Sequence, residues 1–369
     1  MPPCRAICVK YFSRFQSRLR AKRSSALIAG FSIAPHNSRL CHSSAVCAYT
    51  HCRAPSSLWL RKSSLRGNFL AHEDNHLTDR LPTLFVPHGG GPCFFMDWGP
   101  GFPADMWDSM ASFLRSVADG VGRKPKAVVV ISGHWETESP TVMSVEKNTL
   151  LYDYFGFPKH TYELEYPAAG SPKVAARVQE LLTGAGFACN LEKERGLDHG
   201  VFVPFLLIYP DADVPMLQLS LPRGVDVADL AAIGKALAPL RDEDVLIVGS
   251  GMSYHNIPGI LGRIPGQAEP SAAFDAWLGS AMEIEDEAER LHALEGWRNA
   301  PFASTCHPTP EHLLPLFIVA GAGGGDRAAR VYNAKTLGNP QSAFCFGEGA
   351  GRWDRANAGS GELAARLHP

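Results

Sequence analysis

The chain has 369 residues, 45% of them hydrophobic and 20% charged, and no stretch approaches the roughly 20 continuous apolar residues of a membrane-spanning helix. Of its 35 Lys and Arg residues, 12 lie in residues 1–72, which leaves 23 to face all 37 Asp and Glu residues in the remainder. This negative body argues against a nucleic-acid partner, because phosphate binding needs a basic face, and we expect no membrane partner either.

The N-terminal 78 residues differ in composition from the rest. Residues 1–72 hold no Asp or Glu and are rich in Ser and Arg, with scattered Leu, Phe and Ile. This composition is typical of a transit peptide, so residues 1–78 are predicted to be a disordered extension that directs the chain to the mitochondrion or plastid. The alternatives are a disordered basic tail without a targeting function, or an upstream region wrongly taken as coding. In either case the protein would be cytoplasmic.

From about residue 80, short apolar runs alternate with longer segments of helical periodicity. This pattern predicts an α/β fold, with a central mixed β-sheet flanked by helices and an active site at the carboxyl ends of the strands. We expect a single domain over 79–355 and a flexible tail over 356–369, because no linker or repeat interrupts the body. The predicted strands are 83–87, 126–132, 214–220, 245–249 and 343–346. The predicted helices are 104–120, 172–186, 225–240, 271–293 and 311–321.

Residues 150–170 form an aromatic segment, rich in turn residues, that lacks a clear period. Long irregular loops are uncommon in compact domains and often carry function. Such a segment could wall a pocket for a planar substrate, or its rings could simply pack over an edge of the sheet. The residues alone leave these two interpretations even.

Three histidines come directly after predicted strands or after a glycine beside one. His88 follows 83–87 and precedes three glycines, which would let a ligand approach the backbone. His134 lies in a Ser-Gly-His-Trp-Glu turn, and His255 follows a Gly-Ser-Gly segment. Because parallel strands end at one edge of a sheet, these imidazoles are expected to converge and could hold a divalent metal.

His199 is placed differently, because it precedes an apolar run instead of following one. We interpret it as a general acid/base at the rim of the site, the commonest role for an imidazole that titrates near neutrality. The neighbouring Asp198 could orient its ring, although adjacent side chains rarely bond to each other. The alternative is a fourth metal ligand, which would close a tetrahedral site.

Several short motifs follow one another through the body. They are 87–92 (PHGGGP), 132–136 (SGHWE), 152–158 (YDYFGFP), 197–200 (LDHG), 209–215 (YPDADVP) with 218–220 (QLS), and 309–316 (TPEHLLPL). In this order they resemble the class III extradiol ring-cleaving dioxygenases, specifically the DOPA 4,5-dioxygenase branch. The resemblance covers residues from about 81 to 347, so it would make the body a single catalytic domain.

The resemblance implies metal ligands at His88, His134 and His255, and an acid/base role for His199. It also implies a catalytic role near the site for His312, either behind the ligands or facing the substrate. Other members of the class use two histidines and one glutamate on Fe(II). An all-histidine set suits zinc, but zinc has no redox chemistry, so we expect Fe(II) for activity and Zn(II) as a frequent occupant of the single metal site.

The implied substrates are a small aromatic diol and O2. His199 would take a proton from one hydroxyl, and the ring would open beside the diol to give a muconic semialdehyde. The sequence leaves open which catechol is cleaved, whether the 2,3 or the 4,5 bond opens, and whether the protein is a homo-oligomer.

Two other functions compete with this interpretation. A zinc-dependent hydrolase would use His199 as base, but the chain has no HExxH motif. A noncatalytic phosphopeptide-binding relative is the second, and retention of the site histidines argues against it. Two further interpretations are that His307 packs in the core, and that Glu136 and Asn256 either hold ligand rings or are polar turn residues.

Overall fold

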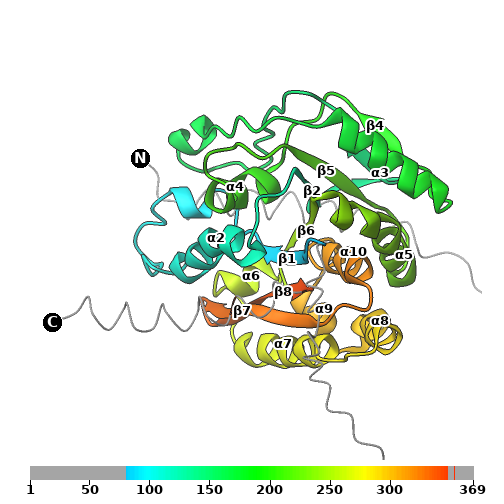
Figure 1. Ribbon diagram of the computed structural model, residues 1–369. Coiled ribbons are helices and arrows are strands. Elements are labelled where there is room, and N and C mark those ends of the chain that lie inside the picture. Colours follow the sequence, from blue (N-terminus) through cyan, green and yellow to red (C-terminus); the bar gives the residue numbers. More distant parts are fainter. Residues whose placement is uncertain (1–79, 348–352, 354–369) are drawn as a thin grey trace, which may run out of the picture. The chain divides into compact units, whose positions relative to one another are not determined.

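The computed structural model describes residues 80–347 and Trp353, and within this part a single mixed sheet of eight strands forms the centre (Figure 1). The strands are β1 (Thr83–Pro87), β2 (Ala127–Thr137), β3 (Thr141–Met143), β4 (Asn190–Glu192), β5 (Met216–Pro222), β6 (Val245–Gly251), β7 (Ala328–Thr336) and β8 (Asn339–Phe346). Their order in the sheet is β4-β3-β5-β2-β6-β1-β8-β7. The central strands β5, β2, β6 and β1 run parallel, whereas β3 and β8 lie antiparallel to their neighbours β5 and β1.

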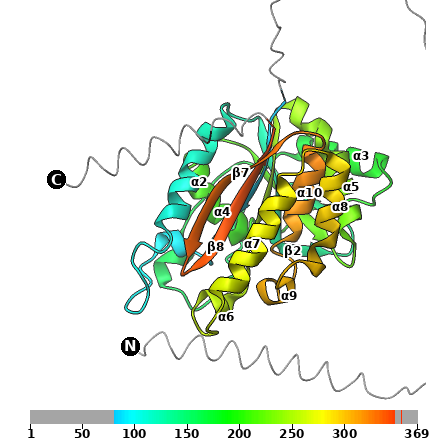
Figure 2. The same cartoon turned by 90° about the horizontal axis from the view of Figure 1, so that it is seen from below.

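Helices cover both faces of this sheet. The α-helices are α2 (Asp108–Val121), α3 (Pro172–Gly184), α4 (His199–Ile208), α5 (Val227–Leu237), α6 (Ile257–Ile260), α7 (Ala268–Met282), α8 (Glu287–Glu295), α9 (Ala303–Cys306) and α10 (Leu314–Gly323). Gly249 of β6 lies against the backbone of Pro315 in α10, whereas the next residue, Ser250, hydrogen-bonds Gly200 in α4. Because successive strand residues point to opposite faces, α10 and α4 lie on opposite sides of the sheet. Figure 2 shows α2 with α4 on one side, and α10 with α5 and α8 on the other.

The predicted position of the active site follows from the strand order. Strands β2, β6 and β1 are neighbours and parallel, with Ser132 paired to Ser250 and Pro87 paired to Gly251. Their carboxyl ends therefore meet at one edge of the sheet, as the α/β prediction required. His88 comes directly after β1, and His255 lies in the segment that follows β6.

The structure corrects several predicted elements. β2 does not end at residue 132: its pairing with β6 stops there, and after a register shift it pairs with β5 again from Glu136. The predicted helix 271–293 is two helices, because Asp286 begins α8 by accepting a hydrogen bond from the Glu289 backbone N–H. α4 was not predicted as a helix, since it is apolar on every side and shows no amphipathic period. The prediction also missed three strands at the edges of the sheet, β3, β4 and β7.

The core lies on both faces of the central strands, whose residues in β1 and β6 are all buried. Among the residues that the structure describes, none of the helices is both long and apolar enough to cross a membrane. The predicted extension 1–78 and tail 356–369 lie outside the described residues.

Candidate metal centre

Five histidines lie together at the carboxyl edge of the parallel strands. His88 follows β1, His134 lies inside β2 at its register shift, and His255 follows β6. His199 is the first residue of α4, and His312 lies in the turn before α10. Ring contacts link them all, down to a parallel stack of His255 on His312 with centroids 3.4 Å apart. The fold thus brings together every histidine that the sequence analysis assigned to the site.

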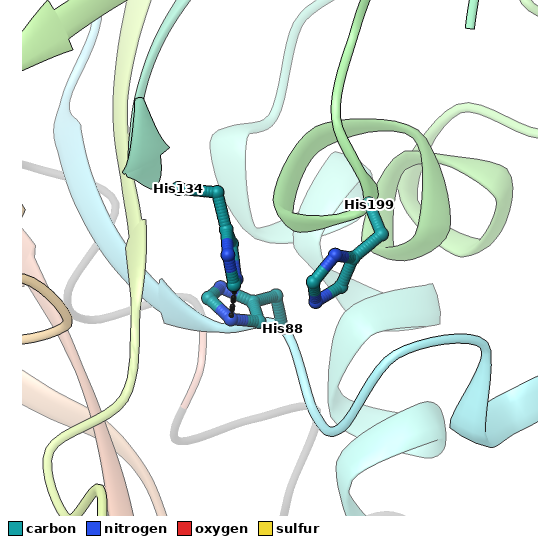
Figure 3. A group of neighbouring side chains, drawn as sticks. All are labelled: His88, His134 and His199. Atoms are coloured by element: carbon teal, nitrogen blue, oxygen red, sulfur yellow. Dashed lines mark hydrogen bonds between the residues drawn. The ribbon is translucent and has the colours of Figure 1, made fainter. Parts of the chain in front are cut away.

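Nitrogen atoms of three of these rings converge. His134 Nε2 lies 3.2 Å from His88 Nε2 and 3.2 Å from His312 Nε2. Figure 3 shows His88 and His134 meeting at this contact, with the ring of His199 directed toward them from the start of α4. One ring nitrogen each from His88, His134 and His199 lie within 4.8 Å of one another, and the same limit groups His255, Glu311 and His312.

Two glycines allow the His312 segment to reach this edge. A Cβ on Gly133 would lie 2.9 Å from the Glu311 carbonyl oxygen, and a Cβ on Gly251 would lie 2.0 Å from the His312 carbonyl oxygen. The His312 carbonyl also accepts a hydrogen bond of 2.9 Å from the Met252 N–H. The glycines beside the strand ends therefore make room for a second backbone segment.

The three glycines after His88 have a role different from the one predicted. A Cβ on Gly89 would lie 2.3 Å from Cys93 Sγ, and one on Gly91 would lie 3.0 Å from the Phe157 ring. Protein side chains therefore lie where a ligand was predicted to approach. Gly89 lets the loop after β1 fold tightly on itself, and Gly91 lets it pack against the aromatic segment.

A chain of hydrogen bonds orients His88. Pro204 has no N–H to donate to the carbonyl of Gly200, four residues earlier in α4, and this carbonyl accepts the Ser250 hydroxyl instead. Because the Ser250 proton is used there, its oxygen is free to accept from His88 Nδ1, 3.0 Å away. With the proton on Nδ1, the lone pair of His88 lies on Nε2, the atom that faces His134.

Asp198 does not orient His199, contrary to one sequence interpretation. Its buried carboxylate accepts hydrogen bonds from Ser132 Oγ at 2.8 Å, from Arg195 Nη2 at 3.0 Å and from the Gln218 amide. This network joins the middle of β2, at Ser132, to the residue that precedes α4. It supports the backbone around His134.

Two other carboxylates contact the site histidines, and the sequence analysis did not single them out. Asp153 Oδ1 accepts from His199 Nδ1 at 2.7 Å, and Glu311 Oε1 lies 3.2 Å from His312 Nδ1. Asn256 instead caps α6 and donates to the Thr305 carbonyl, and the Glu136 side chain is exposed. The available signal was an acidic residue inside an aromatic segment and another beside a histidine.

Burial keeps most of the site histidines neutral. Burial, with repulsion from neighbouring histidines, lowers the pKa of His134 to about 4 and that of His255 to about 3. The same causes hold the pKa of His88 and His312 well below the ordinary range. At neutral pH these rings therefore carry free lone pairs.

This donor set fits a divalent metal ion. Two nitrogens bound to one ion at about 2.0–2.1 Å lie roughly 3.0–3.4 Å apart. Both approaches to His134 Nε2, at 3.2 Å, match that separation. Buried neutral imidazoles that face one another are also the ligands that Fe(II) and Zn(II) accept.

The aromatic segment does reach the site. The Tyr154 ring lies 5.8 Å from that of His199 and 5.5 Å from that of Phe157, which in turn contacts Trp98. The Tyr154 hydroxyl donates to the Thr161 carbonyl, so its ring is held in place.

His307, as interpreted, packs in the core, with Nε2 2.9 Å from the Ser253 carbonyl and its ring against Phe274.

Comparison with known proteins gives consistent matches. Residues 82–345 match the family described as the catalytic LigB subunit of aromatic ring-opening dioxygenase. The chain is 41% identical to a 4,5-DOPA dioxygenase extradiol of Beta vulgaris over 255 residues, which cover 68% of this chain and 91% of the relative. It is 40% identical to one of Portulaca grandiflora over 263 residues, covering 68% and 94%. A crystal structure of an uncharacterized Escherichia coli K12 protein has a TM-score of 0.58 and 29% identity, and covers 73% of this chain and 100% of that one.

The family match includes every histidine of the site, from His88 to His312. It favours neither a hydrolase nor a noncatalytic binder, and it agrees with a metal-dependent site built from buried imidazoles. The chain therefore belongs to the extradiol aromatic ring-opening dioxygenase family, on the branch that contains these 4,5-DOPA dioxygenases, and is a catalytic member of it.

Proposed function

We propose that His88 and His134, with one ring of the stacked pair His255 and His312, hold one divalent metal ion, and that His199 moves the substrate proton. The main support is the approach of His88 Nε2 and His312 Nε2 to His134 Nε2, each at 3.2 Å. The family resemblance points to His255 as the third ligand, whereas these distances also offer His312. The role of His199 is supported by the hydrogen bond from its Nδ1 to the Asp153 carboxylate, which leaves Nε2 to accept a proton.

The third ligand is tested by metal content. His255→Ala and His312→Ala are purified without oxygen, loaded with Fe(II) and analysed for iron. The variant that lacks the third ligand is expected to lose the metal. The other variant is expected to keep the metal and to lose turnover, because the residue it lacks would face the substrate. If both variants keep a full equivalent of iron, neither ring is a ligand and the proposed set is wrong.

We propose Fe(II) as the active metal and Zn(II) as a frequent occupant. Bound Fe(II) would let electrons pass between a catechol and O2, which zinc cannot do. Metal-free protein reconstituted with Fe(II) is expected to consume O2 in the presence of a catechol, whereas protein loaded with Zn(II) is not. Equal oxygen uptake with both ions would contradict this assignment.

We propose a DOPA-like or other small catechol as the substrate, because the relatives are named 4,5-DOPA dioxygenases. His199 Nε2 would take a proton from one hydroxyl, and the rings of Tyr154 and Phe157 would wall the aromatic ring. Ring opening beside the diol should then give a yellow semialdehyde. A screen of substituted catechols, with the products identified by mass spectrometry and NMR, decides the preferred substrate and the bond that opens.

We also propose that residues 1–78 direct the chain to the mitochondrion or plastid, because residues 1–72 are basic and hold no Asp or Glu. Fusion of this segment to a fluorescent protein is expected to label one of these organelles. Diffuse fluorescence would leave a cytoplasmic enzyme. Light scattering of the purified full chain tests whether the enzyme is a homo-oligomer.

A further inference from the structure

Asp153 makes two hydrogen bonds to a single site residue. It lies in the irregular segment between β3 and the 3-10 helix Lys159–Glu163. Its Oδ1 accepts from His199 Nδ1 at 2.7 Å and from the His199 backbone N–H at 3.0 Å. Two bonds from one oxygen to the ring and the backbone of the same residue fix the ring relative to the start of α4.

The backbone around Asp153 is itself attached to the segment before His199. The Leu151 N–H donates to the Leu197 carbonyl at 2.8 Å, and the Leu197 N–H donates to the Thr149 carbonyl at 2.8 Å. These bonds form a short parallel bridge between Leu150 and Leu197. Asp153 therefore lies three residues after one side of the bridge, and His199 lies two residues after the other. Their contact is a consequence of paired backbone and does not depend on a flexible side chain alone.

This contact determines which nitrogen of His199 carries the proton. A carboxylate can only accept, so Nδ1 carries the proton of this bond, and in the neutral ring Nε2 keeps its lone pair. Without such a partner, the proton of a neutral imidazole favours Nε2, and His199 could then not accept a proton there. The His199 ring lies 4.0 Å from that of His134, and one of its nitrogens lies within 4.8 Å of ring nitrogens of His88 and His134.

The second oxygen of the same carboxylate faces a proposed ligand. Asp153 Oδ2 lies 3.5 Å from His134 Nδ1. This is longer than a good hydrogen bond, but it is close enough for attraction to an Nδ1–H group. One carboxylate therefore lies between the ring that would move the proton and a ring that would hold the metal.

We propose that Asp153 is the positioning residue of this enzyme: it binds the Nδ1–H of His199 and so presents the lone pair of Nε2 to the substrate hydroxyl. The proposal rests on the proposed role of His199 as the proton acceptor. In the step, the O–H bond of the substrate breaks and an N–H bond forms at His199 Nε2. Asp153 takes no proton, and its negative charge stabilises the imidazolium that results.

The first test observes the proton directly in metal-free protein. The full chain is labelled with 15N-histidine, and His199→Gln assigns the signals of His199. The wild type is expected to show the Nδ1–H tautomer, and Asp153→Ala is expected to shift His199 toward Nε2–H. Glu163→Gln is the matched control, because Glu163 lies in the 3-10 helix that follows this segment, where its exposed side chain pairs with Lys159. An unchanged tautomer in Asp153→Ala overturns the proposal.

The second test is a double-mutant cycle on turnover. Asp153→Ala is expected to lower kcat by about 10²- to 10³-fold with little change in KM, within the usual range for a general base. In the His199→Gln background the same substitution should have almost no further effect, because Asp153 acts through His199. A purely structural role would instead lower activity and melting temperature in both backgrounds.

Asp153→Asn guards against a folding defect, since it preserves the volume of the side chain while it removes the charge and one acceptor oxygen. It is expected to lower kcat by at least about 10-fold with an unchanged melting temperature. If His199→Gln alone leaves kcat intact, the proposed role of His199 fails. If His199→Gln lowers kcat but neither Asp153 variant differs from Glu163→Gln, only the assignment of Asp153 is wrong.

Discussion

His88 and His199 face the same site, but the chain holds them in different ways. His88 follows a buried strand, and its Nδ1 meets the neutral hydroxyl of Ser250. His199 begins a helix, and its Nδ1 meets the carboxylate of Asp153. Burial raises the pKa of this carboxylate, but the contacts with His199 and His134 outweigh burial and lower the pKa to about 2. A neutral partner favours a neutral imidazole with a free lone pair, whereas a charged partner also stabilises the imidazolium. The two partners therefore suit one ring to metal binding and the other to proton transfer.

Removal of a ring on the metal side should have the largest effect. His134→Ala removes the nitrogen that both His88 and His312 approach, so the metal is expected to be lost and turnover to fall by more than about 100-fold, beyond the loss typical of an outer partner. Elemental analysis after anaerobic loading with Fe(II) measures the metal. The control is His292→Ala, whose side chain is 87% exposed. A full equivalent of iron in His134→Ala would sink the assignment.

Removal of the ring on the proton side should separate turnover from metal binding. His199→Gln is expected to keep a full equivalent of iron, because its Nδ1 is bound to Asp153. It should lose about 10²- to 10⁴-fold in kcat, as expected for a general base. Iron analysis and oxygen uptake on the same preparation check both parts. Loss of iron would make His199 a fourth ligand and remove the difference between the two rings.

The partner of His88 should have a smaller effect, and only on the metal side. Ser250→Ala removes the acceptor that keeps the His88 proton on Nδ1. The dissociation constant for the metal is expected to rise about 10- to 100-fold, with kcat at saturating metal nearly unchanged. Ser271→Ala is the control, because Ser271 is equally buried and bonds only within α7. An unchanged metal affinity would show that Ser250 does not orient His88.

Change of pH should have the smallest effect on metal affinity. Burial lowers the pKa of His134 to about 4 and that of His255 to about 3, so protons compete for these nitrogens only near those values. The metal dissociation constant is expected to change less than about threefold between about pH 7.5 and 5.5. A loss of about tenfold per histidine over that range would mean that these rings titrate with ordinary pKa values.

The stability of the metal-free fold should respond to the same pH change. The unfolded chain binds protons at the ordinary histidine pKa of 6.5, whereas folded His134 and His255 remain neutral until lower pH. The free energy of unfolding should therefore fall as the pH drops below about 6.5, and level off below the folded pKa values. Above about pH 6.5 these rings contribute no pH dependence. Urea denaturation of metal-free protein at several pH values measures this slope.

The local sequence pattern predicted the central strands and α3 well, because the spacing of apolar residues in each element reflects which of its faces are buried. The β-branched runs of β1 and β6 are buried strands, and the period of α3 matches an amphipathic helix. α4 escaped prediction because a helix buried on every side has no polar face. The split between α7 and α8 does have a local signal, an Asp-x-x-Glu cap at Asp286, which the predicted helix 271–293 did not take into account.

The histidines of the site could be found from the sequence, since each lies in a motif or beside a strand end. Their assigned roles remain predictions, because the family resemblance supplied most of them. The partners Ser250 and Asp153 could not be found in this way. Their contacts join positions 162 and 46 residues apart, so no local pattern carries them.

The sequence by itself determined the α/β architecture and the set of imidazoles that meet at the edge of the sheet. Only the tertiary structure decided which nitrogen of His88 and of His199 is free, because the position of a proton depends on the donor or acceptor that the fold places beside it. Pro204 leaves a carbonyl free for Ser250, and a short backbone bridge brings Asp153 to His199. His88 and His199 are therefore suited to different roles, metal binding and proton transfer, because the fold gives their rings different hydrogen-bond partners.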